Sequence, residues 1–177
     1  KGGGRQYLDG KVSPSHRATM TSPFILGIDP GRETGLAGVS ADTGAVAFVC
    51  SASPLETIRL IEVWHTERAL IGVCIEDSRD LPIYARHGGK GRGERERVAR
   101  SVGRVDGLTD LYLDVLTTLG ISARCVEPVR AAKWDAETCA RLTGWRERSN
   151  QHGRDALRLV FRRSGSLFAE RNPMQRA

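Results

Sequence analysis

The stretch from Phe24 to Gly31 reads FILGIDPG and restricts the fold more than any other part of the chain. Its apolar residues are nearly continuous, which is typical of a strand buried in a sheet. The run ends at the carboxylate of Asp29 and passes directly into a Pro-Gly turn. Because an unpaired charge is costly inside a core, we expect this strand to present Asp29 at an edge of the sheet, where a ligand can reach it.

Length and charge restrict the class of protein. The chain has 177 residues, of which 40% are hydrophobic, enough for one domain with a real core. Its formal net charge of +6 favours an anionic partner such as nucleic acid. The longest apolar run, around residues 69–75, is far shorter than the ~20 residues that span a bilayer, so no membrane segment is expected.

The cysteines show neither a CxxC pair nor a histidine at metal-ligand spacing. Three of the four lie in apolar runs predicted to be strands. We therefore expect reduced core thiols in a cytoplasmic protein, namely Cys50, Cys74, Cys125 and Cys139.

Both ends of the chain differ in composition from its middle. Residues 1–22 are polar, rich in glycine and without periodicity, which predicts a disordered N-terminal tail or an added leader. Residues 164–177 are also polar and predict a frayed C-terminal tail. We expect one folded domain over residues 23–163, with a basic loop over residues 79–97.

Hydrophobic periodicity predicts a definite order of strands and helices. Strands over 24–29, 36–40 and 45–50 form an antiparallel meander with a tight turn at 42–44. A helix from Pro54, a strand over 69–76, a long helix over 95–119 and a strand over 121–127 follow. Two short helical pieces over 129–142 and a helix over 151–163 complete the order.

This βββ-α-β-α-β-α order is that of the ribonuclease H-like fold. It is an α/β fold whose mixed five-stranded sheet joins a three-strand antiparallel meander to parallel strands and is flanked by helices. The long helix is expected to bury one stripe, formed by Val98, Val102, Val105, Leu108, Tyr112, Val115 and Leu119.

Acidic residues stand at the ends of two predicted strands and at the start of the last helix. Asp29 ends the first strand, Glu76 ends the fourth, and His152 and Asp155 share one face of the helix. A ribonuclease H-like sheet would bring them together, where the carboxylates would repel unless a cation or a raised pKa relieved them. Oxygen ligands with one imidazole suit Mg²⁺ or Mn²⁺, so we expect a metal site for phosphodiester hydrolysis, with two ions.

Each of these residues also has a purely structural interpretation. Asp29 could form the turn, Glu76 could be a surface charge, and Asp155 could favour the positive end of the helix dipole. Their joint occurrence at three related positions of the predicted fold favours the metal site.

Several segments together resemble the RuvC-type Holliday junction resolvases, especially short phage-like members. They are GIDPG with Thr34–Ala37, Ile75–Glu76, residues 99–107, and HGRDAL at 152–157, and the resemblance covers about residues 24–161. It implies a homodimeric crossover junction endodeoxyribonuclease that cuts two opposed strands of a four-way DNA junction with divalent metal. It also implies that Asp29, Glu76 and Asp155 are the catalytic carboxylates and that His152 takes the fourth position.

The sequence departs from this family at two places. The family's aromatic wedge shortly follows the second carboxylate, whereas Arg79 stands three residues after Glu76 and the nearest aromatic residue is Tyr84. A basic residue follows the fifth strand, and both Arg130 and Lys133 fit this position. We expect one of these two to hold the scissile phosphate and take Lys133 as a catalytic candidate.

Basic residues are concentrated after the fourth strand, with eight of them against three acidic residues between positions 79 and 104. The predicted loop leaves directly from Glu76, so phosphate contacts beside the metal site are expected, with a solvated charged surface as the alternative. The predicted DNA-binding residues are Arg79, Tyr84, Arg86, Lys90, Arg92, Arg95, Arg130 and Lys133. Gly103 and Gly107, one helical turn apart, allow close packing either in the core or at a dimer interface.

Other classes of function share parts of this pattern. Sugar kinases and actin-like ATPases share the fold and a D-x-G-x-x-x-T-G loop, but they need a second such domain that a chain of this length cannot house. The main alternative is a ribonuclease H-like nuclease that acts on RNA/DNA hybrids, flaps or other branched nucleic acid. A junction-binding protein without catalysis is the remaining alternative.

Overall fold

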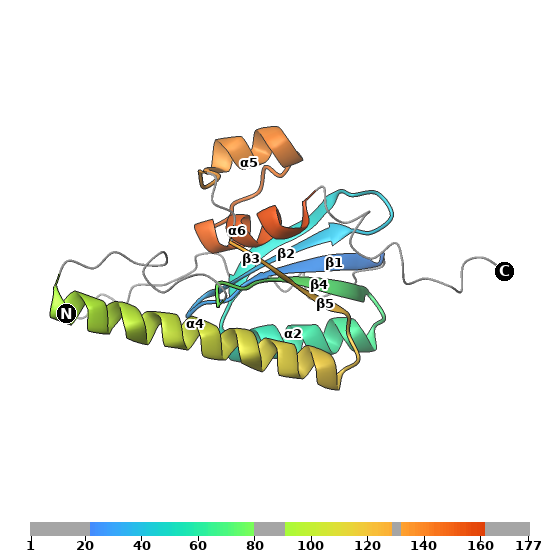
Figure 1. Cartoon of the computed structure of the whole chain (residues 1–177). Helices are drawn as coiled ribbons and strands as arrows, with labels where there is room; N and C mark the ends of the chain where they lie inside the picture. The colour runs from blue at the N-terminus through green and yellow to red at the C-terminus, as the bar shows by residue number, and fades with distance from the viewer. Residues whose placement is uncertain (1–21, 80–90, 129–131, 162–177) are drawn as a thin grey trace, which may run out of the picture.

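FILGID forms the central strand of a mixed five-stranded sheet in a computed structural model that describes residues 22–79, 91–128 and 132–161 (Figure 1). The strand order is β3-β2-β1-β4-β5. β1 (Phe24–Asp29), β2 (Thr34–Ser40) and β3 (Val46–Ala52) form an antiparallel meander, and β4 (Leu70–Glu76) and β5 (Ala123–Val126) continue the sheet in parallel. β1 is apolar on both faces because both faces of the sheet are covered by helices.

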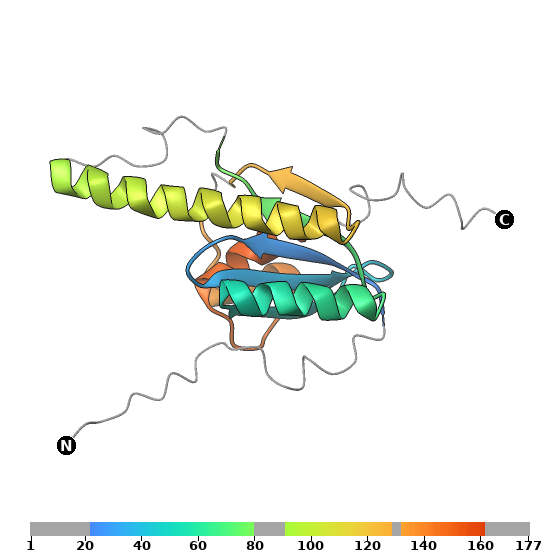
Figure 2. The same cartoon turned by 90° about the horizontal axis from the view of Figure 1, so that it is seen from below.

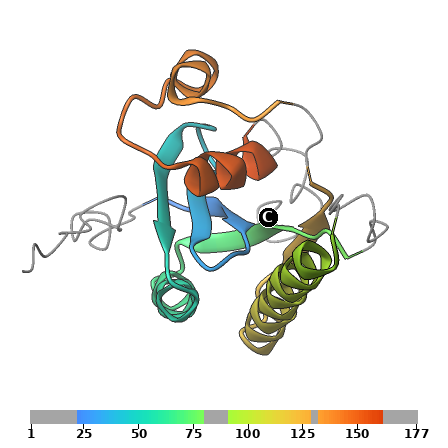
Figure 3. The ribbon, with the colours of Figure 1, turned by 90° about the vertical axis from the view of Figure 1, so that its left-hand side faces the viewer.

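Helices cover the two faces of the sheet in pairs (Figures 2 and 3). α2 (Pro54–Thr66) and α4 (Arg92–Thr118) lie on one face. α6 (Gln151–Val160) lies directly on the other face, and α5 (Ala136–Thr143) lies beyond it. This arrangement is that of the ribonuclease H-like fold, so the predicted fold class is confirmed.

The core beneath α2 and α4 is built around three aromatic rings. Phe24 packs edge-on against Phe48 and Trp64, with ring centroids 5.6 and 5.3 Å away, and Phe48 stacks on Trp64 at 5.2 Å. All three side chains are buried. Aromatic rings bury large apolar areas, so this cluster fixes α2 against the meander.

The buried stripe of α4 differs from the prediction. Tyr112 and Leu116 are its buried apolar residues, while Val98 and Val102 in its first half are only half-buried. Figures 1 and 2 show the reason, because this first half of α4 runs beyond the end of the sheet. Apart from the adjoining backbone of α4 itself, no described atom lies within 4 Å of a Cβ added at Gly103 or Gly107, so these glycines do not serve core packing within the described chain.

Two further predictions need correction. The expectation of two helical pieces over 129–142 is wrong for residues 132–135, which are irregular and lead to Asp135, the N-cap of α5. The expectation that all four cysteines are core thiols is wrong for Cys125, which is exposed because β5 is an edge strand. No disulfide joins any of these four described cysteines, and burial, followed by the charge of Glu56, raises the pKa of Cys50 to about 12.

The remaining boundaries lie close to the prediction. β2 begins two residues earlier than expected, at Thr34, and α4 begins at Arg92. The predicted tails and most of the predicted basic loop lie outside the described residues. Within the described ranges, no helix combines the length and the apolar character that crossing a membrane requires.

Candidate metal and phosphodiester site

The site begins where β1 and β4 end side by side. Ile28 pairs with Ile75 in the parallel ladder, so Asp29 and Glu76 directly follow paired residues at the same edge of the sheet. The Asp29 side chain is 14% exposed, and that of Glu76 is half-buried. The structure therefore places these two predicted carboxylates next to each other.

α6 reaches this edge because it rests on the backbone of the sheet. A Cβ on Gly27 would lie 2.2 Å from the carbonyl oxygen of Ala156, and one on Gly35 would lie 2.0 Å from that of His152. From the helix side, a Cβ on Gly153 would lie 2.8 Å from the carbonyl oxygen of Cys50. These contacts leave no room for a side chain, which explains the glycines at positions 27, 35 and 153 in physical terms.

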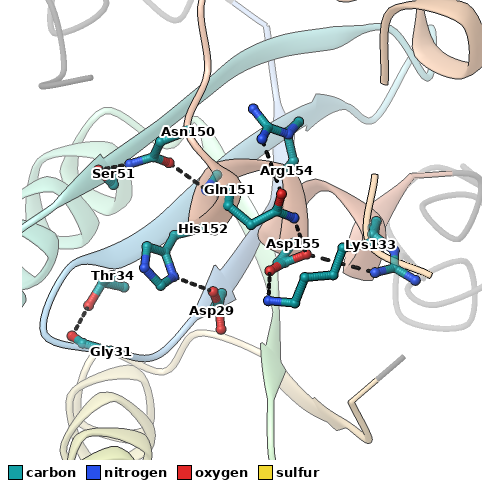
Figure 4. Close-up of polar contacts among 12 residues, drawn as sticks. Asp29, Gly31, Thr34, Ser51, Lys133, Asn150, Gln151, His152, Arg154 and Asp155 are labelled. Carbon is teal, nitrogen blue, oxygen red and sulfur yellow. Dashed lines mark hydrogen bonds and ion pairs between the residues drawn. The ribbon is translucent and has the colours of Figure 1, made fainter. Parts of the chain in front are cut away.

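The first turn of α6 is fixed by its N-cap. The side chain of Asn150 accepts a hydrogen bond from the Gly153 amide at 2.9 Å and donates one to the Ser51 hydroxyl at 2.7 Å (Figure 4). Ser51 belongs to β3, so the cap ties the start of the helix to the sheet. His152 then lies with Nδ1 at 3.1 Å from Asp29 Oδ2.

Asp155 lies on the same helix and is almost fully buried. Its Oδ2 accepts a hydrogen bond from Lys133 Nζ at 2.8 Å, and its Oδ1 accepts one from Gln151 Nε2 at 2.9 Å (Figure 4). Arg158 Nη1 lies 3.8 Å from Oδ1. The structure thus joins Lys133, a predicted phosphate ligand, directly to a predicted metal ligand.

Sequence reasoning missed the residues that hold Asp155 from within the helix. Gln151 lies four residues before Asp155 and Arg158 three after it, so helical spacing alone could have found them. Gln151 is held in turn by Arg154, whose Nη2 donates to Gln151 Oε1 at 3.1 Å. Arg154 also donates to the carbonyl oxygens of Trp134 and Ser149, at 3.0 and 2.5 Å.

The electrostatics of the site are those of crowded carboxylates. Burial, followed by the charges of Asp29 and Asp155, raises the pKa of Glu76 to about 7. The hydrogen bond to Asp29 raises the pKa of His152, and the hydrogen bond to Asp155 raises that of Lys133. A bound cation would relieve the repulsion between these carboxylates.

The donor set fits a hard divalent cation in its chemistry. Carboxylate oxygens from Asp29, Glu76 and Asp155 are the ligands that Mg²⁺ and Mn²⁺ prefer. In the described part of the chain, no three His, Cys, Asp or Glu side chains are gathered closely enough to hold an ion. Asp29 is turned to His152 and Asp155 to Lys133, so the carboxylates would have to exchange these partners for a cation.

Arg79, a predicted DNA contact, is engaged within the protein. Its guanidinium donates to Asp77 Oδ1 at 2.8 Å and to Oδ2 at 2.5 Å, and it also pairs with Asp110 of α4. These hydrogen bonds lower the pKa of Asp77 to about 2. The network ties the segment that follows Glu76 to α4.

The other predicted DNA contacts are only partly visible. Arg95 is exposed on the first half of α4. Tyr84, Arg86, Lys90 and Arg130 lie outside the described residues, as does the side chain of Arg92.

A buried hydroxyl pair supports the turn after Asp29. Thr34 Oγ1 lies 2.6 Å from the Tyr112 hydroxyl and 3.2 Å from the Gly31 carbonyl oxygen, to which it donates. Both Thr34 and Tyr112 are buried. The bond links α4 to the loop that follows the first carboxylate, a contact that no local pattern predicts.

Comparisons with known proteins find a likeness in structure. No protein-family model matches the chain, and no curated protein matches its sequence. Among solved structures, the chain is similar to "T. thermophilus RuvC in complex with Holliday junction substrate", with 19% identity and a TM-score of 0.49 over 84% of this chain and 95% of that chain. A likeness at this level assigns no role to any residue, so the chemistry of the site has to come from its own side chains.

Proposed function

We propose that this chain is a metal-dependent endodeoxyribonuclease that resolves four-way DNA junctions by paired phosphodiester hydrolysis. One observation carries the proposal: Asp29, Glu76 and Asp155, from two strand ends and one helix, share a sheet edge with Lys133 and His152. The resemblance of GIDPGxxTG and HxxDAL to the RuvC-type resolvases supports the choice of substrate.

Asp29, Glu76 and Asp155 would hold one or two divalent cations, Mg²⁺ or Mn²⁺. Such ions, when bound, supply an activated water and stabilise charge on the leaving 3′ oxygen. Lys133 would bind a non-bridging oxygen of the scissile phosphate as a point charge. His152, whose pKa is raised by Asp29, would hold a proton near the reacting phosphate or serve as a fourth ligand.

Substrate binding is proposed to depend on basic side chains outside this cluster. Exposed arginines on the first half of α4, such as Arg95, would contact phosphates and position the DNA without reading its sequence. Two opposed cuts require two sites, so we propose that the active form is a homodimer.

A second candidate is a ribonuclease H-like nuclease for RNA/DNA hybrids or flaps. The specific observation in its favour concerns Arg79, which takes the place of the family's aromatic wedge. Its guanidinium is engaged by Asp77 and Asp110, so it is not available to insert at a junction centre. The same three carboxylates would hold the divalent cations for the hydrolysis of either substrate.

One experiment tests the choice. A mobile and an immobile four-way junction, a flap and an RNA/DNA hybrid are incubated with the protein in Mg²⁺, in Mn²⁺ and in EDTA. Symmetric paired nicks in the junctions, lost in EDTA, are the expected result. Cutting of the hybrid alone would reject junction resolution. Cutting in EDTA would reject the proposal that cleavage depends on a metal.

A further inference from the structure

The two oxygens of the Asp155 carboxylate have partners of different kinds (Figure 4). Oδ1 accepts from Gln151, which is held by Arg154. Arg154 is anchored on main-chain carbonyl oxygens of Trp134 and Ser149. A series of hydrogen bonds that ends on the backbone fixes the orientation of the carboxylate, because none of its members can turn without leaving a partner unpaired.

The partner of Oδ2 is held far less firmly. The Lys133 side chain is 69% exposed, whereas that of Asp155 is only 10% exposed. Lys133 lies in residues 132–135, which form neither helix nor strand, and its ammonium sits at the end of a flexible stem. A solvent-screened ion pair of this kind opens easily, so Oδ2 can exchange its partner while Oδ1 keeps its own.

The ammonium of Lys133 also interacts electrostatically with the other two carboxylates of the site. Asp29 and Glu76 both act on it electrostatically, in addition to its hydrogen bond with Asp155. His152 lies on Asp29 and Arg158 near Asp155 Oδ1, but Lys133 is the basic group that occupies Asp155 Oδ2, the oxygen that a cation would use. Lys133 and an incoming ion would therefore compete for the same oxygen.

We propose that Lys133 is an internal counter-ion of Asp155 that a divalent cation displaces, and that the displaced ammonium then becomes available to the scissile phosphate. This inference rests on the proposed function, since it assumes that the carboxylates bind the cation. It sets an order of events, in which the cation binds first and Lys133 reaches DNA afterwards. A lysine that stayed away from the carboxylates and only bound phosphate would leave cation binding in the absence of DNA nearly unchanged.

Titration calorimetry of the full chain with Mn²⁺, without DNA, separates these cases. The variant Lys133→Met keeps the length of the stem and removes the charge. Arg59→Met is the matched control, because it removes one charge from the exposed face of α2, on the opposite side of the sheet from α6. Circular dichroism confirms that each variant is folded.

We expect Lys133→Met to bind Mn²⁺ about two- to fivefold more tightly than the wild type, and Arg59→Met to remain within about twofold. Equal or weaker binding by Lys133→Met, or equal tightening in Arg59→Met, would overturn the inference. An absence of Mn²⁺ binding in all three proteins would instead overturn the metal site of the proposed function.

A second readout follows Lys133 itself. In the wild type, the side-chain ammonium signal of Lys133, assigned by its loss in Lys133→Met, is followed by NMR during titration with Mg²⁺. The signal is expected to shift with the midpoint of Mg²⁺ binding. A Lys133 signal that stays unchanged while Mg²⁺ binds would contradict displacement.

Discussion

Gly35 on β2 lies directly against the main-chain carbonyl of His152 on α6, so closely that a Cβ on Gly35 would come within 2.0 Å of that oxygen. No non-bonded carbon and oxygen atoms tolerate such a distance, so any side chain at position 35 would push α6 away from the sheet. The 3.1 Å contact between His152 Nδ1 and Asp29 Oδ2 depends on this close approach.

The variant Gly35→Ala is expected to lower the free energy of unfolding by about 1–3 kcal/mol, because the helix must move to admit the methyl group. Its cleavage rate should fall as well, since His152 and Asp155 move with the helix. Urea unfolding measures the first effect. Gly103→Ala is the control: it lies on the exposed half of α4, meets no described atom, and should raise stability by about 0.5–1 kcal/mol. A loss of stability in both variants would argue against the contact as the cause.

Asp29→Asn is expected to reduce cleavage in Mg²⁺ by about 10³-fold or more while junction binding persists. Cleavage falls because the amide is a poor ligand for a hard cation. Junction binding persists because the substitution removes a negative charge that repels phosphate. Gel shift and nicking assays measure the two properties separately. Asp114→Asn, at an exposed aspartate of α4, should cut like the wild type. Full cleavage by Asp29→Asn would show that Asp29 is not a metal ligand in the cleavage reaction.

Glu76 is expected to make stability fall as pH rises in the absence of divalent cations. Its pKa is raised to about 7 in the folded protein, so the folded state binds its proton more tightly than the unfolded chain does. The favourable contribution is complete below about pH 4.5 and is lost as pH rises through about 7. After allowance for solvent screening, the loss is about 1–2 kcal/mol.

Urea unfolding in EDTA at pH 4.5 and pH 8 measures this effect. Glu76→Gln carries no titrating group at this position, so it should lose less stability than the wild type over the same interval. Glu62→Gln, at an exposed position of α2, should follow the wild type. Parallel pH profiles for the wild type and Glu76→Gln would contradict the crowding of carboxylates at the sheet edge.

Tyr112→Phe is expected to destabilise the fold by about 1–2 kcal/mol, because it leaves the buried hydroxyl of Thr34 without one of its partners. A double-mutant cycle with Thr34→Val isolates the pair. The expected coupling energy is about 0.5–1 kcal/mol. Strictly additive losses would show that the two hydroxyls stabilise the fold independently.

The sequence predicted the sheet because strand formation leaves a local pattern. FILGID and LIGVCIE are apolar runs with a carboxylate at the end, and parallel strands bring such ends to one edge. The start of β2 was missed because Thr34 and Gly35 are not apolar. They pair with Ala52 and Ser51, at the end of β3, which only the folded sheet reveals.

Contacts between distant segments account for most of what could not be predicted. The pair of Lys133 with Asp155 joins residues 22 positions apart, and that of Arg79 with Asp110 joins residues 31 apart. Such pairs depend on the path of irregular segments, which periodicity does not describe. Gln151 differs, because its distance of one helical turn from Asp155 is visible in the sequence itself.

The central position of β1 has a consequence for the timescales of the site. β1 is hydrogen-bonded on both sides, by β2 and β4, so its amides exchange with solvent only when the sheet opens, at nearly the free energy of global unfolding. Residues 132–135 have no such ladder, and their amides exchange through small local openings. Asp29 therefore keeps its place for as long as the molecule stays folded, while the exposed side chain of Lys133 changes its conformation many times in the same interval.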